Sequence, residues 1–270
     1  MSSFKKSSAQ QLTALLNPLS PTRDEWRRFS DISRIPIGEP NELPWWKRLL
    51  DVTSILVSLP GWLIVFIAIA IWIKLVSPGP LFFCQERIGY RGRPFKIFKF
   101  RTMEVNVETR SHELYLEHLM NANCPMTKLD VKGDRRIIFG GRILRALGLD
   151  ELPQLFNVLR KEMSLVGPRP CIPNEFKAYK GWQLERFNAV PGLTGYWQVN
   201  GKNKTTFQKM IEMDIHYCRH ASFWLDLLIL LRTIPAVVSQ VVESRVSGAQ
   251  RKTEINVPLQ SGTGSFGEPI

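Results

Sequence analysis

Four charged residues in one stretch of the chain have the types and spacing to catalyse a reaction at phosphorus. Residues 145–170 read RALGLDELPQLFNVLRKEMSLVGPRP, so the adjacent acids Asp150 and Glu151 lie between Arg145 and Arg169. A carboxylate can attack phosphorus or hold a metal ion, and guanidinium groups can neutralise phosphate oxygens. The local pattern also has a simpler interpretation, because acids near a helix start are often caps or partners of the helix dipole.

The apolar spacing after the acid pair predicts a helix from about residue 151 to residue 161. Leu152, Leu155 and Leu159 would share one face of this helix. Pro153 would lie in its first turn, where a missing N–H costs little. The first turn of a helix has backbone N–H groups without partners and a positive dipole end, so we expect phosphate to bind here.

A second cluster of polar residues lies in the segment 190–207, VPGLTGYWQVNGKNKTTF. Its glycines and proline indicate tight turns, from which Gln198 and Asn200 could reach the polar groups of a ligand. The alternative is an ordinary loop whose aromatic residues pack in the core.

A third cluster is FKIFKFRTM, residues 95–103, in which Lys99 and Arg101 are candidates for binding phosphate. This segment follows a long apolar run. Basic residues beside a membrane segment often contact anionic lipid headgroups instead.

The charge of the whole chain indicates an anionic partner. The chain has 36 Lys and Arg against 24 Asp and Glu, a formal charge of +12. An anionic membrane surface and phosphorylated small molecules both fit this charge. Nucleic acid fits poorly, because no recognisable binding module or aromatic–basic platform is present. The four cysteines are widely spaced, which predicts reduced thiols, and the four histidines form no metal-binding pattern.

One apolar run, Val52 to Val76, is long enough to enter a membrane and has no charged residue before Lys74. Pro60 interrupts this run, and proline is expected to kink or break a helix. Basic residues flank the run on both sides, so both flanks are predicted to be cytoplasmic by the positive-inside rule. A re-entrant helix hairpin satisfies this pattern, and a plain kinked transmembrane helix is the alternative.

These elements predict an α+β fold in four parts. Residues 1–44 form a flexible or membrane-surface leader, and residues 45–76 form the re-entrant membrane helix. Residues 77–242 form a mostly helical catalytic domain, which contains a small β-hairpin and amphipathic interfacial helices, one of them near its end. Residues 243–270 form a disordered tail.

Taken together, the motifs resemble the bacterial sugar transferase family, the monotopic phosphoglycosyl transferases. The resemblance covers about residues 45–240 and rests on motifs in one order: KRLLD, an apolar run broken at proline, SPGP, FKFRTM, LDELPQLFNVLRKEMSLVGPRP, PGLTGYWQVNGK and MDIHY. It implies a re-entrant helix in the bacterial cytoplasmic membrane and a catalytic domain that faces the cytoplasm. It also implies Mg²⁺-dependent transfer of a sugar-1-phosphate from a UDP-sugar to polyprenyl (undecaprenyl) phosphate, with release of UMP, as the first membrane step of polysaccharide or glycoconjugate assembly.

The resemblance also implies roles for individual residues. Asp150 is the expected nucleophile, forming a covalent phosphosugar intermediate, and Glu151 is its acidic partner, the two being the expected metal ligands. Arg145 and Arg169 match phosphate-binding positions of the family, and Asp214 matches an acidic position. At the helix break the family often has Ser-Pro, whereas here Leu59 precedes Pro60.

Several alternatives remain open at the level of sequence. A direct, single-displacement phosphotransferase is the alternative mechanism, and a single-span scaffold protein with a basic domain is the alternative class. The identity of the sugar is open, and so is a homodimer.

Overall fold

The computed structural model describes residues 43–104, 119, 124–126, 136–179, 181–201 and 205–255. Within these ranges the chain has α-helices, short 3-10 helices and two small sheets, so the predicted α+β class is confirmed. The predicted leader, apart from residues 43 and 44, and residues 256–270 of the predicted tail lie outside the described residues.

The described helices run from residue 45 to residue 255. They are α3 Trp45–Val76, η2 Tyr90–Gly92, α5 Gly141–Leu147, η4 Leu149–Gln154, α6 Leu155–Leu159, α7 Pro173–Ala178, η5 Gly181–Asn188, α8 Tyr196–Val199, α9 Phe207–His220 and α10 Phe223–Ile255, where η denotes a 3-10 helix. The last helix continues past residue 242, where the sequence analysis ended the catalytic domain.

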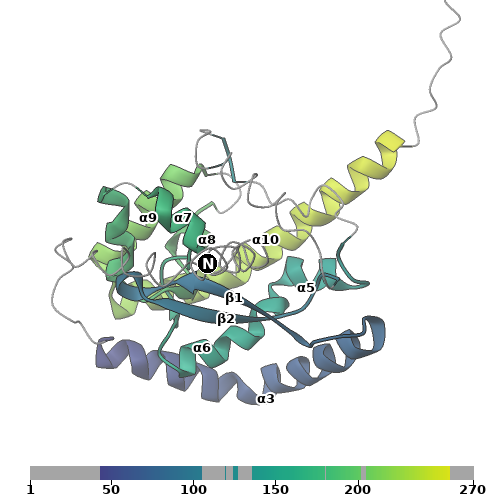
Figure 1. Cartoon of the computed structure of the whole chain (residues 1–270), viewed down its shortest axis with the longest axis horizontal. Coiled ribbons are helices and arrows are strands. Elements are labelled where there is room, and N and C mark those ends of the chain that lie inside the picture. Colours follow the sequence, from purple (N-terminus) through teal and green to yellow (C-terminus); the bar gives the residue numbers. More distant parts are fainter. Residues whose placement is uncertain are drawn as a thin grey trace, which may run out of the picture.

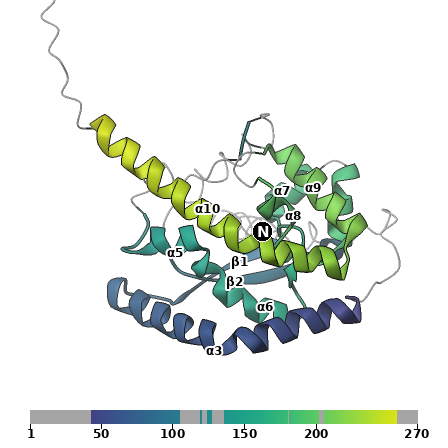
Figure 2. The ribbon, with the colours of Figure 1, turned by 180° about the vertical axis from the view of Figure 1, so that it is seen from behind.

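The strands form two separate pairs. The predicted hairpin is confirmed: β1 Phe82–Ile88 and β2 Pro94–Phe100 pair antiparallel, with Phe82 opposite Phe100. A shorter pair, β3 Ser164–Val166 and β4 Gly192–Thr194, is parallel. The β1–β2 hairpin lies above α3 and α6 in Figure 1. In Figure 2, which shows the molecule from behind, α10 passes in front of the hairpin.

The apolar run folds into one continuous helix, α3, with Pro60 inside it. Figure 1 shows that this helix bends near its middle, the region where Pro60 lies in the sequence. Pro60 has no N–H for the preceding turn. In that turn Ser58 Oγ donates to Ser54 O (2.6 Å) and Trp62 Nε1 donates to Ile55 O (3.2 Å). Side-chain donors to helix carbonyls favour bending of a helix. Ser58, the residue before Leu59, therefore contributes to the bend of α3.

The amino-terminal end of α3 is joined to the domain through a buried lysine. Lys47 Nζ donates to Asp226 Oδ2 (2.5 Å), to Tyr217 Oη (2.8 Å) and to the carbonyl of Val166 (2.8 Å). Lys47 is 4% exposed and Asp226 is 0% exposed. One ammonium group therefore joins α3 to β3, α9 and α10.

Asp51 and Arg48 strengthen the same junction from the next turn of α3. Asp51 Oδ1 accepts from the hydroxyl of Ser164 (3.0 Å) and from the backbone N–H of Leu165 (2.9 Å). Arg48 donates to the last carbonyls of α6, those of Val158 and Leu159. A cation at the carboxyl end of a helix is also favoured by the helix dipole.

The carboxyl-terminal half of α3 packs on the same domain through apolar side chains. Ile69 and Ile73 lie in a buried cluster with Phe100 of β2, Ile138 and Leu144. Burying each isoleucine stabilises the fold by about 1.5–3 kcal/mol. Both ends of the helix are thus attached to one domain.

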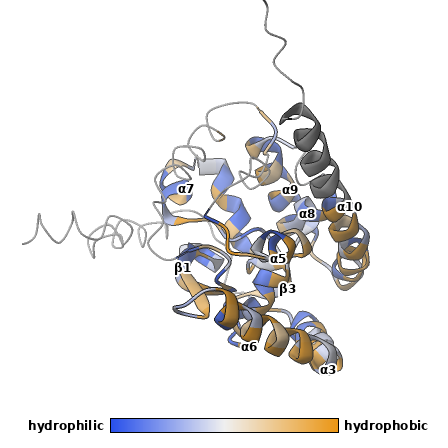
Figure 3. Cartoon of the chain, turned by 90° about the vertical axis from the view of Figure 1, so that its right-hand side faces the viewer, coloured by the Kyte–Doolittle hydropathy of each residue, from blue (hydrophilic) through white to orange (hydrophobic). Residues whose placement is uncertain are grey.

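A large apolar surface remains exposed on α3 and α10. Figure 3 shows hydrophobic residues along α3 and along the coloured part of α10. The exposed side chains include Leu56, Val57, Ile64, Ile67, Ile71 and Leu75 of α3, and Trp224, Leu228, Leu231, Ile234 and Val238 of α10. Among the described residues, Trp45–Val76 and Phe223–Val241 are long and apolar enough to cross a membrane. A surface of this kind is typical of a membrane contact.

Replacing Lys47 should reveal how far the domain depends on the buried junction. Lys47→Ala leaves the Asp226 carboxylate buried without its cation, which should lower the free energy of unfolding by about 3–5 kcal/mol. Thermal unfolding of the protein in nanodiscs measures this effect. Lys74→Ala is the matched control, because Lys74 is an exposed lysine at the other end of α3 and donates to the carbonyl of Gly79. Equal stability of the two variants would contradict this interpretation.

Candidate active site

The acid pair lies in a short 3-10 helix between two turns. Gly148 has a φ of 69°, in the left-handed region that favours glycine, and it both ends α5 and begins η4. Asp150 and Glu151 occupy the first turn of η4, and Asp150 is buried. The predicted helix over residues 151–161 is instead η4 followed by α6. The helical turns begin at Leu149, two residues earlier than predicted, so the ring of Pro153 would clash with the Leu149 carbonyl in a regular α-helix.

Strand β2 places Lys99 beside the acid pair. Lys99 Nζ lies 2.7 Å from Glu151 Oε1, and both side chains are partly exposed. The buried Asn157 of α6 joins the same strand to the helix after the acid pair. Its amide donates to Lys96 O (2.7 Å) and accepts from Phe98 N–H (3.2 Å). Two of the predicted clusters, residues 145–170 and residues 95–103, therefore meet in the fold.

Arg145 lies in the last turn of α5, just before the Gly148 turn that leads to Asp150. Its side chain is partly buried, and Nη1 lies 3.4 Å from Thr102 Oγ1. The position of Arg145 relative to the acid pair therefore depends on the placement of α5, a helix of seven residues.

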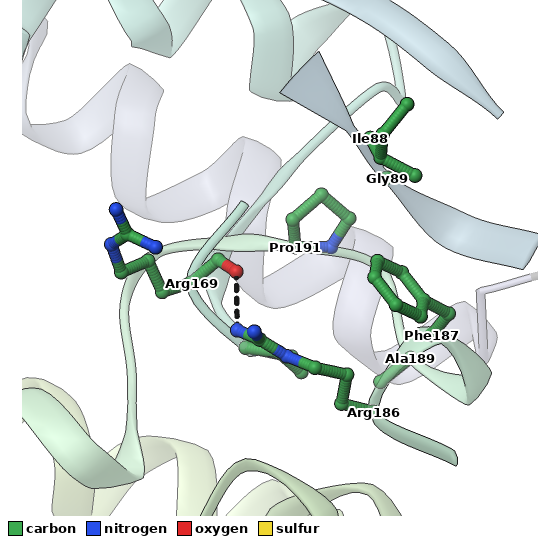
Figure 4. Close-up of a pocket in the computed structure, with 8 residues that line it drawn as sticks. Ile88, Gly89, Arg169, Arg186, Phe187, Ala189 and Pro191 are labelled. Atoms are coloured by element: carbon green, nitrogen blue, oxygen red, sulfur yellow. Dashed lines mark hydrogen bonds between the residues drawn. The ribbon is translucent and has the colours of Figure 1, made fainter. Parts of the chain in front are cut away.

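Arg169 is held by a buried carboxylate. Both oxygens of Glu175, in α7, accept from Arg169 at 3.0–3.1 Å. Burial alone would raise the pKa of Glu175, but the charge and hydrogen bonds of Arg169 hold the pKa below its ordinary value. Arg186 Nη2 donates to the backbone carbonyl of Arg169 (2.7 Å), and Figure 4 shows the Arg169 guanidinium pointing away from the rings of Phe187 and Pro191.

Asp214 forms a second buried ion pair behind the Arg169 loop. Its Oδ2 lies 2.5 Å from Arg186 Nη2, and both side chains are 1% exposed. Burial raises the pKa of Asp214 to about 6, although the nearby guanidinium groups oppose this rise. Arg186 also donates to the hydroxyl of Tyr179. In this structure Asp214 contacts the arginine that supports the Arg169 loop.

The three remaining predicted site residues, Arg101, Gln198 and Asn200, differ in their hydrogen bonding. Arg101 is buried and donates to Ser77 O (2.7 Å) and Pro78 O (2.9 Å), which fixes the turn after α3. Gln198 has a buried Oε1 without a hydrogen-bond partner among the described residues, and Asn200 donates to Tyr196 O (2.8 Å).

The sequence analysis missed Arg87, Glu175 and Arg186, which surround the Arg169 loop. Arg87 Nη1 donates to Pro170 O (3.1 Å), and burial together with the charge of Arg169 lowers the pKa of Arg87 to about 10. In the sequence these residues look like surface charges, because their partners are chosen by packing between distant segments.

The acid pair fits a hard divalent cation that shares its ligands with a substrate. Mg²⁺ usually binds through one or two carboxylates together with substrate phosphates and water. Asp150 and Glu151 supply two adjacent carboxylates, whereas the described residues contain no group of three or more His, Cys, Asp or Glu that could form an all-protein cage.

The comparison with known proteins decides the family. The bacterial sugar transferase family matches residues 43–240, a range that contains α3, the hairpin and the acid pair. The chain belongs to this family. The exopolysaccharide production protein ExoY of Sinorhizobium fredii is 36% identical to the chain over 191 residues, which cover 71% of the chain and 84% of ExoY.

Other relatives of this bacterial sugar transferase are named for their reactions. The UDP-glucose:undecaprenyl-phosphate glucose-1-phosphate transferase of Caulobacter vibrioides is 41% identical over 203 residues, covering 72% of the chain and 70% of that protein. The undecaprenyl-phosphate galactose phosphotransferase of Salmonella typhimurium is 38% identical over 177 residues, covering 63% of the chain but 36% of that longer protein. The chain spans little more than a third of the Salmonella relative. Its family and these relatives show that the chain is a transferase.

Acid titration should expose the buried pair of Arg169 and Glu175. A carboxyl group with a lowered native pKa contributes stability above its ordinary pKa, 4.5, and loses it as pH falls through the native value. Glu175→Gln should therefore lower the unfolding temperature at pH 7, because the free energy of unfolding falls by about 3–5 kcal/mol. The difference in unfolding temperature between the variant and the wild type should become smaller below pH 4.5.

Glu185→Gln is the control for this titration, because Glu185 pairs with Arg219 on the exposed surface. Such surface pairs contribute about 0–1 kcal/mol. A difference between Glu175→Gln and wild type that stays constant down to acid pH would contradict the assigned charge state of Glu175.

Proposed function

We propose that this enzyme transfers a sugar-1-phosphate from a UDP-sugar to a polyprenyl phosphate, such as undecaprenyl phosphate, and releases UMP. The observation that carries the proposal is the Asp150–Glu151 pair beside Lys99, in a domain attached to both ends of an apolar helix. The names of the Caulobacter and Salmonella relatives supply the donor and acceptor chemistry. The reaction would begin assembly of an exopolysaccharide or a similar glycan.

The proposed chemistry has two displacements at the same phosphorus. An oxygen of Asp150 attacks the phosphorus that carries the sugar, and the bond from that phosphorus to the oxygen bridging the two phosphates breaks, so that UMP leaves. An oxygen of polyprenyl phosphate then attacks the same phosphorus, and the bond to Asp150 breaks. The product is a polyprenyl diphosphate sugar, and Asp150 is a free carboxylate again.

The neighbouring residues would divide the remaining tasks. Asp150 and Glu151 would hold Mg²⁺, which when bound neutralises charge on phosphate oxygens. Lys99 places Glu151 by their ion pair. Arg145 and Arg169 would bind the donor phosphates, and the Glu175 carboxylate, which accepts from Nη1 and Nη2 of Arg169, holds that guanidinium in place.

A covalent intermediate is directly testable with the donor alone. The purified enzyme, incubated with the UDP-sugar it uses, should release about one UMP per active site and gain the mass of one sugar phosphate. Asp150→Asn should abolish the adduct while the protein stays folded and membrane-bound. Glu162→Gln, a carboxylate in the same segment that accepts from Asn157, should still form it. UMP release that requires polyprenyl phosphate, with no adduct on wild type, would replace this mechanism by direct displacement.

We also propose that α3 is re-entrant and that the catalytic domain lies on the cytoplasmic face of the bacterial inner membrane. Support comes from the attachments at both helix ends. Lys47 binds Asp226 and Tyr217, while Ile69 and Ile73 pack near β2 and α5. A helix with both ends on one domain cannot place them on opposite sides of a bilayer, and basic flanks favour the cytoplasmic side.

Cysteine accessibility tests this topology. In a background without native cysteines, Trp45→Cys and Arg93→Cys should both react with a membrane-impermeant maleimide only from the cytoplasmic side. Val57→Cys, on an 82% exposed apolar position, should react from neither side, because it would lie in lipid. Labelling of Trp45→Cys or Arg93→Cys from the periplasm would show that α3 spans the membrane and would exclude the re-entrant arrangement.

A further inference from the structure

The carboxyl-terminal half of α3 contacts the segment that leads into the active site through Trp72. Trp72 Nε1 donates to the carbonyl of Phe139 (3.3 Å), and the two rings lie 5.8 Å apart. Phe139 directly precedes Gly140, the residue from which α5 begins. A side chain of the apolar helix α3 therefore contacts the residues directly before the helix that carries Arg145.

The contact at Gly140 leaves no room for a side chain. Gly140 has a φ of 75°, which favours glycine, and a Cβ there would lie 2.9 Å from Trp72 Nε1. The next residue is equally confined, because a Cβ on Gly141 would lie 2.9 Å from the Thr102 carbonyl oxygen. The beginning of α5 is thus packed between the indole of Trp72 and the backbone that follows β2.

The position of α5 depends on these contacts, since a helix of seven residues is only marginally stable in isolation. On its far side, Gln240 of α10 donates to the carbonyl of Ala146 (3.1 Å). Arg145 precedes Ala146, and the turn at Gly148 then leads to Asp150. The two long apolar helices, α3 and α10, therefore contact opposite ends of α5.

We propose that Trp72 is a positioning residue: it ties the membrane helix to α5 and so places Arg145 and Asp150 for the reaction. This inference rests on the proposed function for the roles of those two residues. Trp72 does not touch the reacting atoms. Its effect passes through Gly140 and α5. The position of α3 in the membrane therefore determines the geometry of the active site.

Kinetics distinguish this role from a general structural one. Small misplacements of catalytic groups can lower rates by up to ~100-fold, so Trp72→Ala should reduce kcat by about 10- to 100-fold, with a smaller change in KM for the UDP-sugar. Trp72→Phe keeps a ring against Gly140 but loses the N–H donor, so it should recover part of the lost kcat. Ile71→Ala, at a neighbouring 56% exposed apolar position, should behave as wild type.

A double-mutant cycle tests whether Trp72 acts through Arg145. In an Arg145→Ala background, Trp72→Ala should lower kcat by a smaller factor than it does in the wild type, because one of the two groups that it positions is gone. Multiplicative losses in the double variant would overturn the proposal. So would a Trp72→Ala variant whose only defect is release from the membrane, since that would make Trp72 an interfacial anchor.

Hydrogen exchange gives a readout that does not require activity. In nanodiscs without substrate, Trp72→Ala should speed amide exchange in residues 141–147 at least several-fold, and Ile71→Ala should not. Unchanged exchange in this segment would refute the coupling even in an active enzyme. If Trp72→Ala speeds exchange in this segment but the wild-type protein transfers sugar phosphate from no donor, the contact between Trp72 and α5 is supported and the proposed function is refuted.

Discussion

The buried contact between Lys47 and Asp226 is the constraint on which the rest of the structure depends. A charge removed from water is costly unless it is paired and hydrogen-bonded, and here one ammonium group binds a carboxylate, a tyrosine hydroxyl and the carbonyl of Val166. These partners come from α10, α9 and β3, and each lies more than 100 residues from Lys47 in the sequence. The first turn of α3 therefore completes the interior of the catalytic domain, and neither part would have its present surroundings alone.

The other attachments extend from this junction along α3. Asp51 binds the first residues of β3, and the far half of the helix packs on β2 and on the segment before α5. The bend near Pro60 lets one helix follow the underside of the domain while its outer surface stays apolar. The acid pair lies on segments that contact this helix or β2, so its position is defined relative to α3.

The sequence predicted the local elements better than the contacts between them. The hairpin and the α+β class follow from alternation and turn residues, whereas the proximity of Lys99 to Glu151, 52 residues apart, is visible only in the fold. The Lys47–Asp226 pair joins positions 179 residues apart, and the Arg186–Asp214 pair also depends on tertiary packing. No local period distinguishes such residues from solvated charges. The segment around Pro153 shows the opposite limit: propensity suggested one regular helix from residue 151, whereas the helical turns begin at Leu149 as the 3-10 helix η4 and continue as α6.

The central claim is that this enzyme moves a sugar together with its phosphate onto a membrane lipid. The most direct measurement supplies a panel of UDP-sugars and polyprenyl phosphate to the enzyme in nanodiscs and identifies both products. We expect one donor to yield UMP and a polyprenyl diphosphate sugar in equal amounts. Release of UDP with a polyprenyl monophosphate sugar would show transfer of the sugar alone and would contradict the account, as would the absence of a lipid product with every donor.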